Sequence, residues 1–172
     1  MEAQDNQFRS EDVLSEIKRS FRSRKIVDVE EEQVKMVIFK AGGQDYALYG
    51  SNVLEILSGR EIFPVPFLPN YIPGLINVRG DIEAAIDISL FLGGQSTKHG
   101  KGMIVMIQHE SFRSGVMVDS VEDVLDVPVG SIKPTLPTLT GVLRDLVTGS
   151  VELPDQTVPI LDIKKLSSMA TP

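Results

Sequence analysis

A degenerate internal repeat constrains the fold of this chain more than any other feature. Residues 72–88 (IPGLINVRGDIEAAIDI) recur without a gap as residues 147–163 (VTGSVELPDQTVPILDI), 75 positions further along. The copies share the spacing of their apolar residues and three identities (Gly74 and Gly149, Asp87 and Asp162, Ile88 and Ile163). Shared apolar spacing predicts that both copies present the same faces to a hydrophobic core.

A second match lies upstream at a different spacing. Residues 48–57 (LYGSNVLEIL) align with residues 116–125 (VMVDSVEDVL), 68 positions later. The change in spacing implies additional residues in the second copy, which we place in the Pro- and Thr-rich run 132–140. The sequence therefore predicts two similar halves, at about 34–92 and 102–166. Because a half of ~60 residues has a marginal core of its own, we expect the halves to pack on each other.

Short apolar segments separated by turn residues predict an all-β fold. Segments such as 34–40 (VKMVIFK) and 103–108 (MIVMIQ) have the composition of strands. Prolines at 64, 66 and 69 predict that the segment before the first copy of the repeat is an edge strand or an extended loop. We expect two small barrels, since closing each sheet protects its strand edges.

The first copy of the repeat is expected to form a hairpin followed by a short helix. Strands at 75–78 and 82–86 would flank a tip at 79–81. Asp87 and its counterpart Asp162 each precede an apolar segment, and we interpret them as matching helix N-caps.

A short helical turn is predicted just before the proline-rich segment. Ser51 can cap this turn, in which Val53, Ile56 and Leu57 would face inward while Glu55 faces solvent.

Residues 1–33 differ in composition from the rest of the chain: they are rich in charged residues and poor in glycine and proline. Val13, Ile17 and Phe21 recur at helical spacing, and Ser10 can cap the helix that they predict. We interpret residues 1–33 as a partly helical extension, either loosely docked or a docking helix for a partner protein. Residues 167–172 would form a short C-terminal tail.

Composition excludes several classes of protein and site. The chain has no cysteine, which excludes disulfides and thiolate chemistry and fits a reducing cytosol. No apolar run approaches the roughly 18 residues that a membrane span needs, and the polar, acidic start does not resemble a secretory signal. The net charge of -7 gives no overall attraction to nucleic acid or anionic membranes. We therefore expect a cytoplasmic protein that binds other proteins.

No motif predicts catalysis, a cofactor or a metal site. The glycine-rich run 93–102 does not have the spacing of a phosphate-binding loop, and Gly102 stands where such a loop needs Ser or Thr. His99 and His109, the chain's two histidines, fall in predicted turns without carboxylates at ligand spacing. No nucleophile elbow or acid and base pair is evident, so we expect that the protein is not an enzyme.

The residues from Tyr46 to Asp87 also resemble a known family. GGQDYAL, VLEIL, a proline-rich segment, PNYIPGLINVRG and AIDI follow one another in the order found in CheW, the coupling protein of bacterial chemotaxis. The resemblance extends over roughly residues 34–166. Val78 stands in place of the usual leucine, and residues 83–85 (EAA) replace a common apolar-Pro-apolar triplet. The extension 1–33 is longer than the family requires.

The resemblance implies a fold and a function. CheW-like proteins are two five-stranded SH3-like barrels packed with pseudo-two-fold symmetry around a shared core, and they have no catalytic activity. They join the cytoplasmic tip of a chemoreceptor (a methyl-accepting chemotaxis protein) to the regulatory domain of the histidine kinase CheA. The resemblance thus implies a cytoplasmic adaptor recruited to receptor arrays, with a groove between the barrels that takes the receptor's helical hairpin.

The resemblance also implies binding residues. The family's signalling and receptor-contact positions match Val53, Glu55, Gly74, Arg79 and Gly80. Arg79 is the first candidate, because a guanidinium on a hairpin tip can make several directional hydrogen bonds. It could instead tie the hairpin to its own barrel, and the two glycines could act through backbone conformation alone.

For the kinase contact we expect exposed apolar residues near the proline-rich edge and on the second barrel, namely Ile62, Phe63 and Val129.

Other functions remain open from the sequence. The chain could serve another receptor-kinase pathway, such as pilus or gliding motility. A double-barrel nucleic-acid binder would need a basic face with aromatic residues, yet the Lys and Arg cluster lies in residues 18–25, outside the barrels. An enzyme or small-ligand sensor with a site between the barrels is a further alternative.

Overall fold

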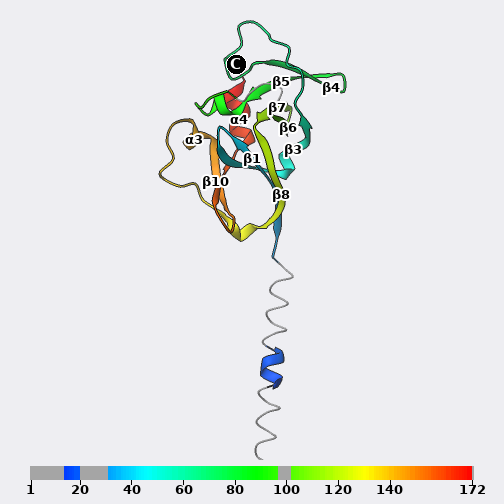
Figure 1. Cartoon of the computed structure of the whole chain (residues 1–172). Coiled ribbons are helices and arrows are strands. Elements are labelled where there is room, and N and C mark those ends of the chain that lie inside the picture. Colours follow the sequence, from blue (N-terminus) through cyan, green and yellow to red (C-terminus); the bar gives the residue numbers. More distant parts are fainter. Residues whose placement is uncertain (1–13, 20–30, 97–101, 172) are drawn as a thin grey trace, which may run out of the picture. The chain divides into compact units, whose positions relative to one another are not determined.

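The computed structural model describes residues 14–19, 31–96 and 102–171 (Figure 1). The chain divides into two compact units, Met1–Gln33 and Val34–Pro172. In the first unit residues 14–19 are helical, with Leu14 and Ile17 exposed; the expected N-cap and the flanking apolar positions lie outside the described residues. No helix in the described part of the chain is long and apolar enough to span a membrane.

The second unit is built from two antiparallel-rich sheets, which confirms the all-β prediction. One sheet has six strands in the order β8-β1-β2-β11-β10-β9, and the other has five in the order β3-β6-β7-β5-β4. The strands of the first sheet are β1 (Gln33–Ala41), β2 (Gln44–Tyr49), β8 (Ser120–Pro128), β9 (Ile132–Lys133), β10 (Val147–Glu152) and β11 (Thr157–Leu161). Those of the second are β3 (Val53–Ser58), β4 (Gly74–Val78), β5 (Asp81–Asp87), β6 (Met103–His109) and β7 (Phe112–Val118).

Each sheet combines strands from both halves of the sequence. The hairpin β1–β2 joins the later strands β8 to β11, whereas the hairpin β6–β7 joins the earlier strands β3 to β5. One join in each sheet is a parallel pair, β2 with β11 and β5 with β7. The other side of each hairpin joins β8 with β1 and, in an antiparallel pair, β3 with β6. The expected barrels at about 34–92 and 102–166 therefore do not coincide with the sheets. A physical reason is that a half of about 60 residues buries too little surface alone, whereas exchanged hairpins commit both halves to every core.

The exchange preserves the predicted repeat. If each strand is replaced by its counterpart in the other half, the order β3-β6-β7-β5-β4 becomes β8-β1-β2-β11-β10, which is the order observed. β9, the remaining strand, corresponds to an isolated bridge between Phe63 and Leu75 in the five-stranded sheet. The duplication is thus visible in the topology as a pseudo-two-fold relation, and the fold is that of two small SH3-like barrels.

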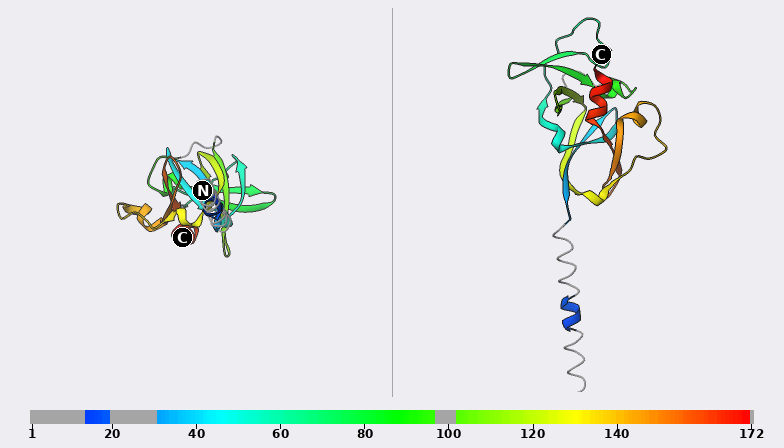
Figure 2. Two further views of the ribbon diagram at one scale, coloured as in Figure 1. Left: turned by 90° about the horizontal axis from the view of Figure 1, so that it is seen from below. Right: turned by 180° about the vertical axis from the view of Figure 1, so that it is seen from behind.

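Three hydrophobic clusters hold the unit together. One lies within the six-stranded sheet and includes Met36 and Ile160, and a second lies within the five-stranded sheet and includes Ile76 and Met106. The third and largest takes residues from both sheets and from α4 (Ile163–Ala170), including Leu166. Figures 1 and 2 show α4 beside strands of both sheets, as this shared cluster requires.

The described part of the unit also contains two further short helices and two single 3-10 turns: α2 (Ile88–Phe91), α3 (Gly141–Leu146), η1 (Gly50–Asn52) and η2 (Val129–Ser131). The prediction of a helical turn capped by Ser51 is wrong. Ser51 lies inside η1, whose N-cap is Tyr49, and residues 53–58 form the strand β3. The spacing of Val53, Ile56 and Leu57 looked helical because an extra residue interrupts the strand's alternation, as described below.

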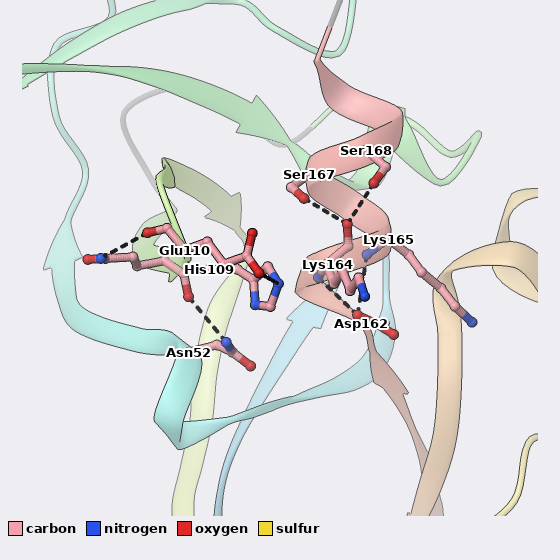
Figure 3. Close-up of polar contacts among 9 residues, drawn as sticks. Asn52, His109, Glu110, Asp162, Lys164, Lys165, Ser167 and Ser168 are labelled. Carbon is pink, nitrogen blue, oxygen red and sulfur yellow. Dashed lines mark hydrogen bonds and ion pairs between the residues drawn. The ribbon is translucent and has the colours of Figure 1, made fainter.

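The predicted helix caps are confirmed at both repeated aspartates. Asp162 accepts hydrogen bonds from the backbone N–H groups of Lys164 and Lys165 at 2.9 and 3.3 Å, at the start of α4 (Figure 3). Asp87 is fully buried; it accepts from Leu90 N at 3.2 Å and from the Ser96 hydroxyl at 2.7 Å.

Alanine at these two caps is expected to have unequal effects. Asp162→Ala should lower the free energy of unfolding by about 1 kcal/mol, the usual cost of a lost N-cap. Asp87→Ala should cost more, because it also removes a second, part-buried hydrogen bond, the one from Ser96. Urea denaturation of the two variants measures the difference. Equal losses would mean that the Ser96 contact contributes nothing.

Candidate protein-binding site

The candidate site is organised by the tip of the β4–β5 hairpin. Val78 pairs with Asp81, so Arg79 and Gly80 alone form the turn. Arg79 has φ of 53° and Gly80 has φ of 92°, and positive values at both positions are the requirement of a type I′ turn. Glycine adopts this conformation freely, whereas a left-handed arginine is strained by about 1 kcal/mol. Such strain persists where surrounding contacts hold the residue in place.

One of these contacts comes from Asn77. The backbone N–H of Gly80 donates a hydrogen bond to Asn77 Oδ1 at 2.8 Å, across the turn. The bond fixes the direction in which the Arg79 side chain leaves the hairpin.

Glu55 reaches the same place from β3. Val53 pairs with Ile107 and Glu55 pairs with Met106, so Leu54 is an extra residue, a β-bulge. The bulge puts Val53 and Glu55 on opposite faces of the sheet. Val53 packs against the shared core, whereas Glu55 lies on the face of Met106, a core residue of the five-stranded sheet.

Arg79 and Glu55 form a two-point ion pair. Arg79 Nη1 donates to Glu55 Oε1 at 2.9 Å, and Nη2 donates to Oε2 at 2.7 Å. Since β3 and β4 are the two edge strands of the five-stranded sheet, the pair connects its edges. The Arg79 side chain remains 73% exposed against 21% for Glu55, so the pair stabilises the fold by less than about 1 kcal/mol. The two hydrogen bonds nevertheless fix the orientation of the guanidinium. Because the side chain is largely exposed, its other N–H donors remain accessible to a partner.

Replacing Asn77 tests how the turn is held. Asn77→Ala should lower the free energy of unfolding by about 1 kcal/mol, because the Gly80 N–H loses its acceptor. Asn77→Asp keeps an acceptor oxygen and should lose less. Chemical denaturation of both variants provides the measurement, and indistinguishable losses would show that the hydrogen bond is not what matters at Asn77.

The two glycines of the expected site differ in their surroundings. Gly74 is buried in β4, and a Cβ there would lie 2.2 Å from the backbone oxygen of Phe63. A Cβ at Gly80 would meet no atom within 4 Å. Gly74 is therefore required for the close approach of two backbones, and Gly80 for the turn.

The apolar residues expected at a kinase contact lie on both sheets. Ile62 is half-buried against the core of the five-stranded sheet, and Phe63, 49% exposed, pairs with Leu75 beside β4. Val129 is 44% exposed in η2, at the end of β8 in the other sheet. The structure thus brings Arg79 and Glu55 into contact and leaves Val129 on a separate sheet.

Sequence reasoning missed three exposed apolar side chains on the same sheet or its proline-rich loop. Leu54 at the bulge is 49% exposed and Ile82 on β5 is 59% exposed. Phe67 is fully exposed and has φ of 65°. A signal existed for Phe67, because a phenylalanine between Pro66 and Pro69 has little room to fold back into a core.

A second ion pair accounts for an unusual residue of the β5 strand. Glu83 lies on the same face of the strand as Ala85, which is a core position. Its side chain is only 14% exposed, which is unusual for a charged residue. Arg113 on the neighbouring strand β7 meets it, with Nε 3.0 Å from Glu83 Oε1. The acidic residue at this position is therefore compensated from within the sheet.

Among residues 14–19, 31–96 and 102–171, no group of three His, Cys, Asp or Glu side chains is placed to hold a metal ion. The five-stranded sheet and its proline-rich loop do carry a directed guanidinium and several exposed apolar side chains, and both kinds of group are common in protein-binding surfaces.

Comparisons with known proteins agree with the resemblance seen in the sequence. Two chemotaxis proteins CheW, from Klebsiella aerogenes and Helicobacter pylori, are each 27% identical, over 78% and 79% of this chain and 81% and 82% of their own lengths. Protein PilI of Pseudomonas aeruginosa is 26% identical over 64% of this chain and 63% of its own. The crystal structure of the scaffolding protein TtCheW from Thermoanaerobacter tengcongensis superimposes with a TM-score of 0.70 and 28% identity, covering 76% of this chain and 90% of that protein.

The sequence profile of the CheW-like domain matches residues 35–171, a range that includes nearly every strand of both sheets. The chain therefore belongs to the CheW-like domain family.

Proposed function

We propose that this chain is a non-catalytic adaptor that couples chemoreceptors to a CheA-type histidine kinase in bacterial chemotaxis. The observation that carries the proposal is membership of the CheW-like family across the whole double-barrel unit. Similarity to chemotaxis proteins CheW and to a CheW scaffolding protein supports it. An adaptor of this kind acts in the cytoplasm at receptor arrays.

The receptor contact is proposed for the surface around Arg79. Glu55 holds the guanidinium at the hairpin tip, and the side chain remains 73% exposed. Exposed apolar residues are also present on the two elements that supply the pair, Leu54 on β3 and Ile82 on β5 of the hairpin. A directed cation with apolar residues on the same elements suits the side of an amphipathic helix, as a receptor's helical hairpin presents. Val53 contributes through the shared core, and Gly74 and Gly80 contribute through backbone geometry.

The kinase contact is proposed for exposed apolar residues outside that surface. The exposed Phe63, with its half-buried neighbour Ile62, offers one such area, and Val129 offers another at the end of β8 in the six-stranded sheet. Two separate areas would let one adaptor bind more than one partner domain.

A second candidate is an adaptor for a different receptor-kinase pathway. The similarity to Protein PilI and to Protein FrzA of Myxococcus xanthus, which is 29% identical over 60% of this chain, favours keeping it.

Reconstitution tests the proposal. Receptor cytoplasmic fragments and the kinase from the same organism are mixed with and without the purified chain, and co-sedimentation and kinase autophosphorylation are measured. We expect the chain to sediment with both partners and to make kinase activity dependent on receptor. Binding to neither partner would refute the adaptor function. Parallel reactions with receptors of different motility pathways distinguish the two candidates.

A further inference from the structure

The edge strand β8 is the counterpart of β3 in the pseudo-two-fold relation. Asp123 of β8 corresponds to Glu55 of β3 at the repeat spacing of 68 residues. Val121 packs against the shared core while Leu125 packs against the core of the six-stranded sheet. Residues four apart on a regular strand share a face, so β8 changes face between them as β3 does at its bulge. By this correspondence Asp123 takes the place along β8 that Glu55 has along β3.

The corresponding hairpin does not supply an arginine to Asp123. The hairpin β10–β11 aligns with β4–β5 without a gap, and its tip is Pro154 and Asp155 where the other hairpin has Arg79 and Gly80. Leu153 N donates to Gln156 O at 2.8 Å, which confirms that Pro154 and Asp155 are the two turn residues. The six-stranded sheet thus has a carboxylate at the tip that carries a guanidinium in the five-stranded sheet.

Asp123 is consequently exposed on an acidic, unpaired edge. β8 ends the order of its sheet, and Glu122, Asp123, Val124 and Asp126 are all exposed along it. Asp123 Oδ1 accepts a hydrogen bond from the adjacent Val124 N at 2.8 Å. Within the described residues no ion pair joins Asp123 to a cation.

The nearby lysines are engaged elsewhere. Lys35 on β1 pairs with Asp126 at 3.0 Å, and Lys40 pairs with Asp45 at 3.1 Å. The hydrogen bond that Lys40 donates to the Asp45 carboxylate is the main reason that the pKa of Lys40 is raised. The acidic edge therefore keeps an uncompensated carboxylate at the position where its counterpart binds a guanidinium.

We propose that the outer edge of β8 is a docking surface for a protein partner that presents an arginine, which pairs with Asp123 as Arg79 pairs with Glu55. Charge complementarity selects the basic side chain, and arginine matches a carboxylate at two points. The exposed Val124 (46%) and Val129 (44%) supply apolar contact next to it. A free strand edge also accepts an extended segment or hairpin of the partner. With the function proposed above, the partner is the regulatory domain of the kinase.

Neutralising Asp123 is the direct test. Asp123→Asn should weaken binding of the kinase regulatory domain about tenfold at low salt, the loss expected for one close ion pair, and should reduce its salt dependence. Binding of receptor fragments should not change. Glu110→Gln, at the exposed tip of the β6–β7 hairpin, removes a charge elsewhere on the same unit and serves as the control.

A graft tests the same contact from the other side. Pro154→Arg with Asp155→Gly gives the β10–β11 hairpin the tip of β4–β5, so that the arginine comes from the chain itself. This double variant should keep or raise the melting temperature and should weaken kinase binding as Asp123→Asn does. Unchanged kinase binding in Asp123→Asn, or equal weakening by Glu110→Gln, would overturn the proposal. Self-association of the wild type that Asp123→Asn abolishes would also overturn it, by assigning the edge to a second copy. A wild type that binds no kinase would instead refute the adaptor function.

Discussion

Arg79→Ala is expected to leave the chain folded and to disconnect it from the receptor. The side chain is 73% exposed, so its ion pair with Glu55 adds less than about 1 kcal/mol to stability. The same guanidinium is the proposed receptor contact, and an arginine that is central to an interface contributes about 2 kcal/mol or more to binding, roughly 30-fold in affinity. Circular dichroism measures whether the variant is folded, a binding assay measures its affinity for the receptor, and receptor-dependent kinase activity measures coupling.

Exchanging the two charged residues distinguishes binding from closure of the sheet. Arg79→Glu combined with Glu55→Arg restores an ion pair between the edge strands but removes the guanidinium from the hairpin tip. If Arg79 contacts the receptor, the exchanged variant stays stable and fails to bind. Recovery of binding in the exchanged variant would mean that Arg79 merely ties the hairpin to its own sheet.

The sequence was most informative where the two copies of the repeat agree. Apolar alternation predicted the β4–β5 hairpin and its tip, and matching positions of Asp87 and Asp162 predicted both caps. Those features depend on residues within one hairpin and the turn that follows it. The local sequence pattern is therefore enough to predict the hairpin and the two caps.

Features that depend on contacts between distant segments were not predictable. Exchange of the hairpins β1–β2 and β6–β7 leaves each strand's own alternation unchanged, so nothing in the pattern reports which sheet a hairpin joins. The bulge at Leu54 had the opposite effect, because it changed the spacing of β3 and imitated a helix. As a result Glu55 was expected to face solvent as part of a helical turn, whereas it lies on the core face beneath Arg79.

Gly74→Ala is expected to be among the most destabilising single substitutions in the unit. A Cβ at Gly74 would lie 2.2 Å from the backbone oxygen and 2.7 Å from the carbonyl carbon of Phe63. Phe63 N and O both bond to Leu75, at 2.8 and 2.9 Å, so relieving the clash means breaking a bridge of two backbone hydrogen bonds. We expect a loss of about 2–4 kcal/mol, seen as a fall of roughly 10 °C in melting temperature.

Gly149→Ala provides the matched control, because it repeats the same clash on the other sheet. There a Cβ would lie 2.7 Å from the backbone oxygen of Lys133, the counterpart of Phe63. The two variants should lose stability to a similar degree, but Gly74→Ala alone should displace the proline-rich loop that carries Phe63. If both variants weaken kinase binding equally, Gly74 affects binding through overall stability. If Gly74→Ala weakens binding more than Gly149→Ala does, the kinase contact depends on the position of Phe63. A Gly74→Ala variant as stable as the wild type would show that the backbones at residues 63 and 74 can move apart without cost. The close approach of these backbones would then matter neither for stability nor for kinase binding.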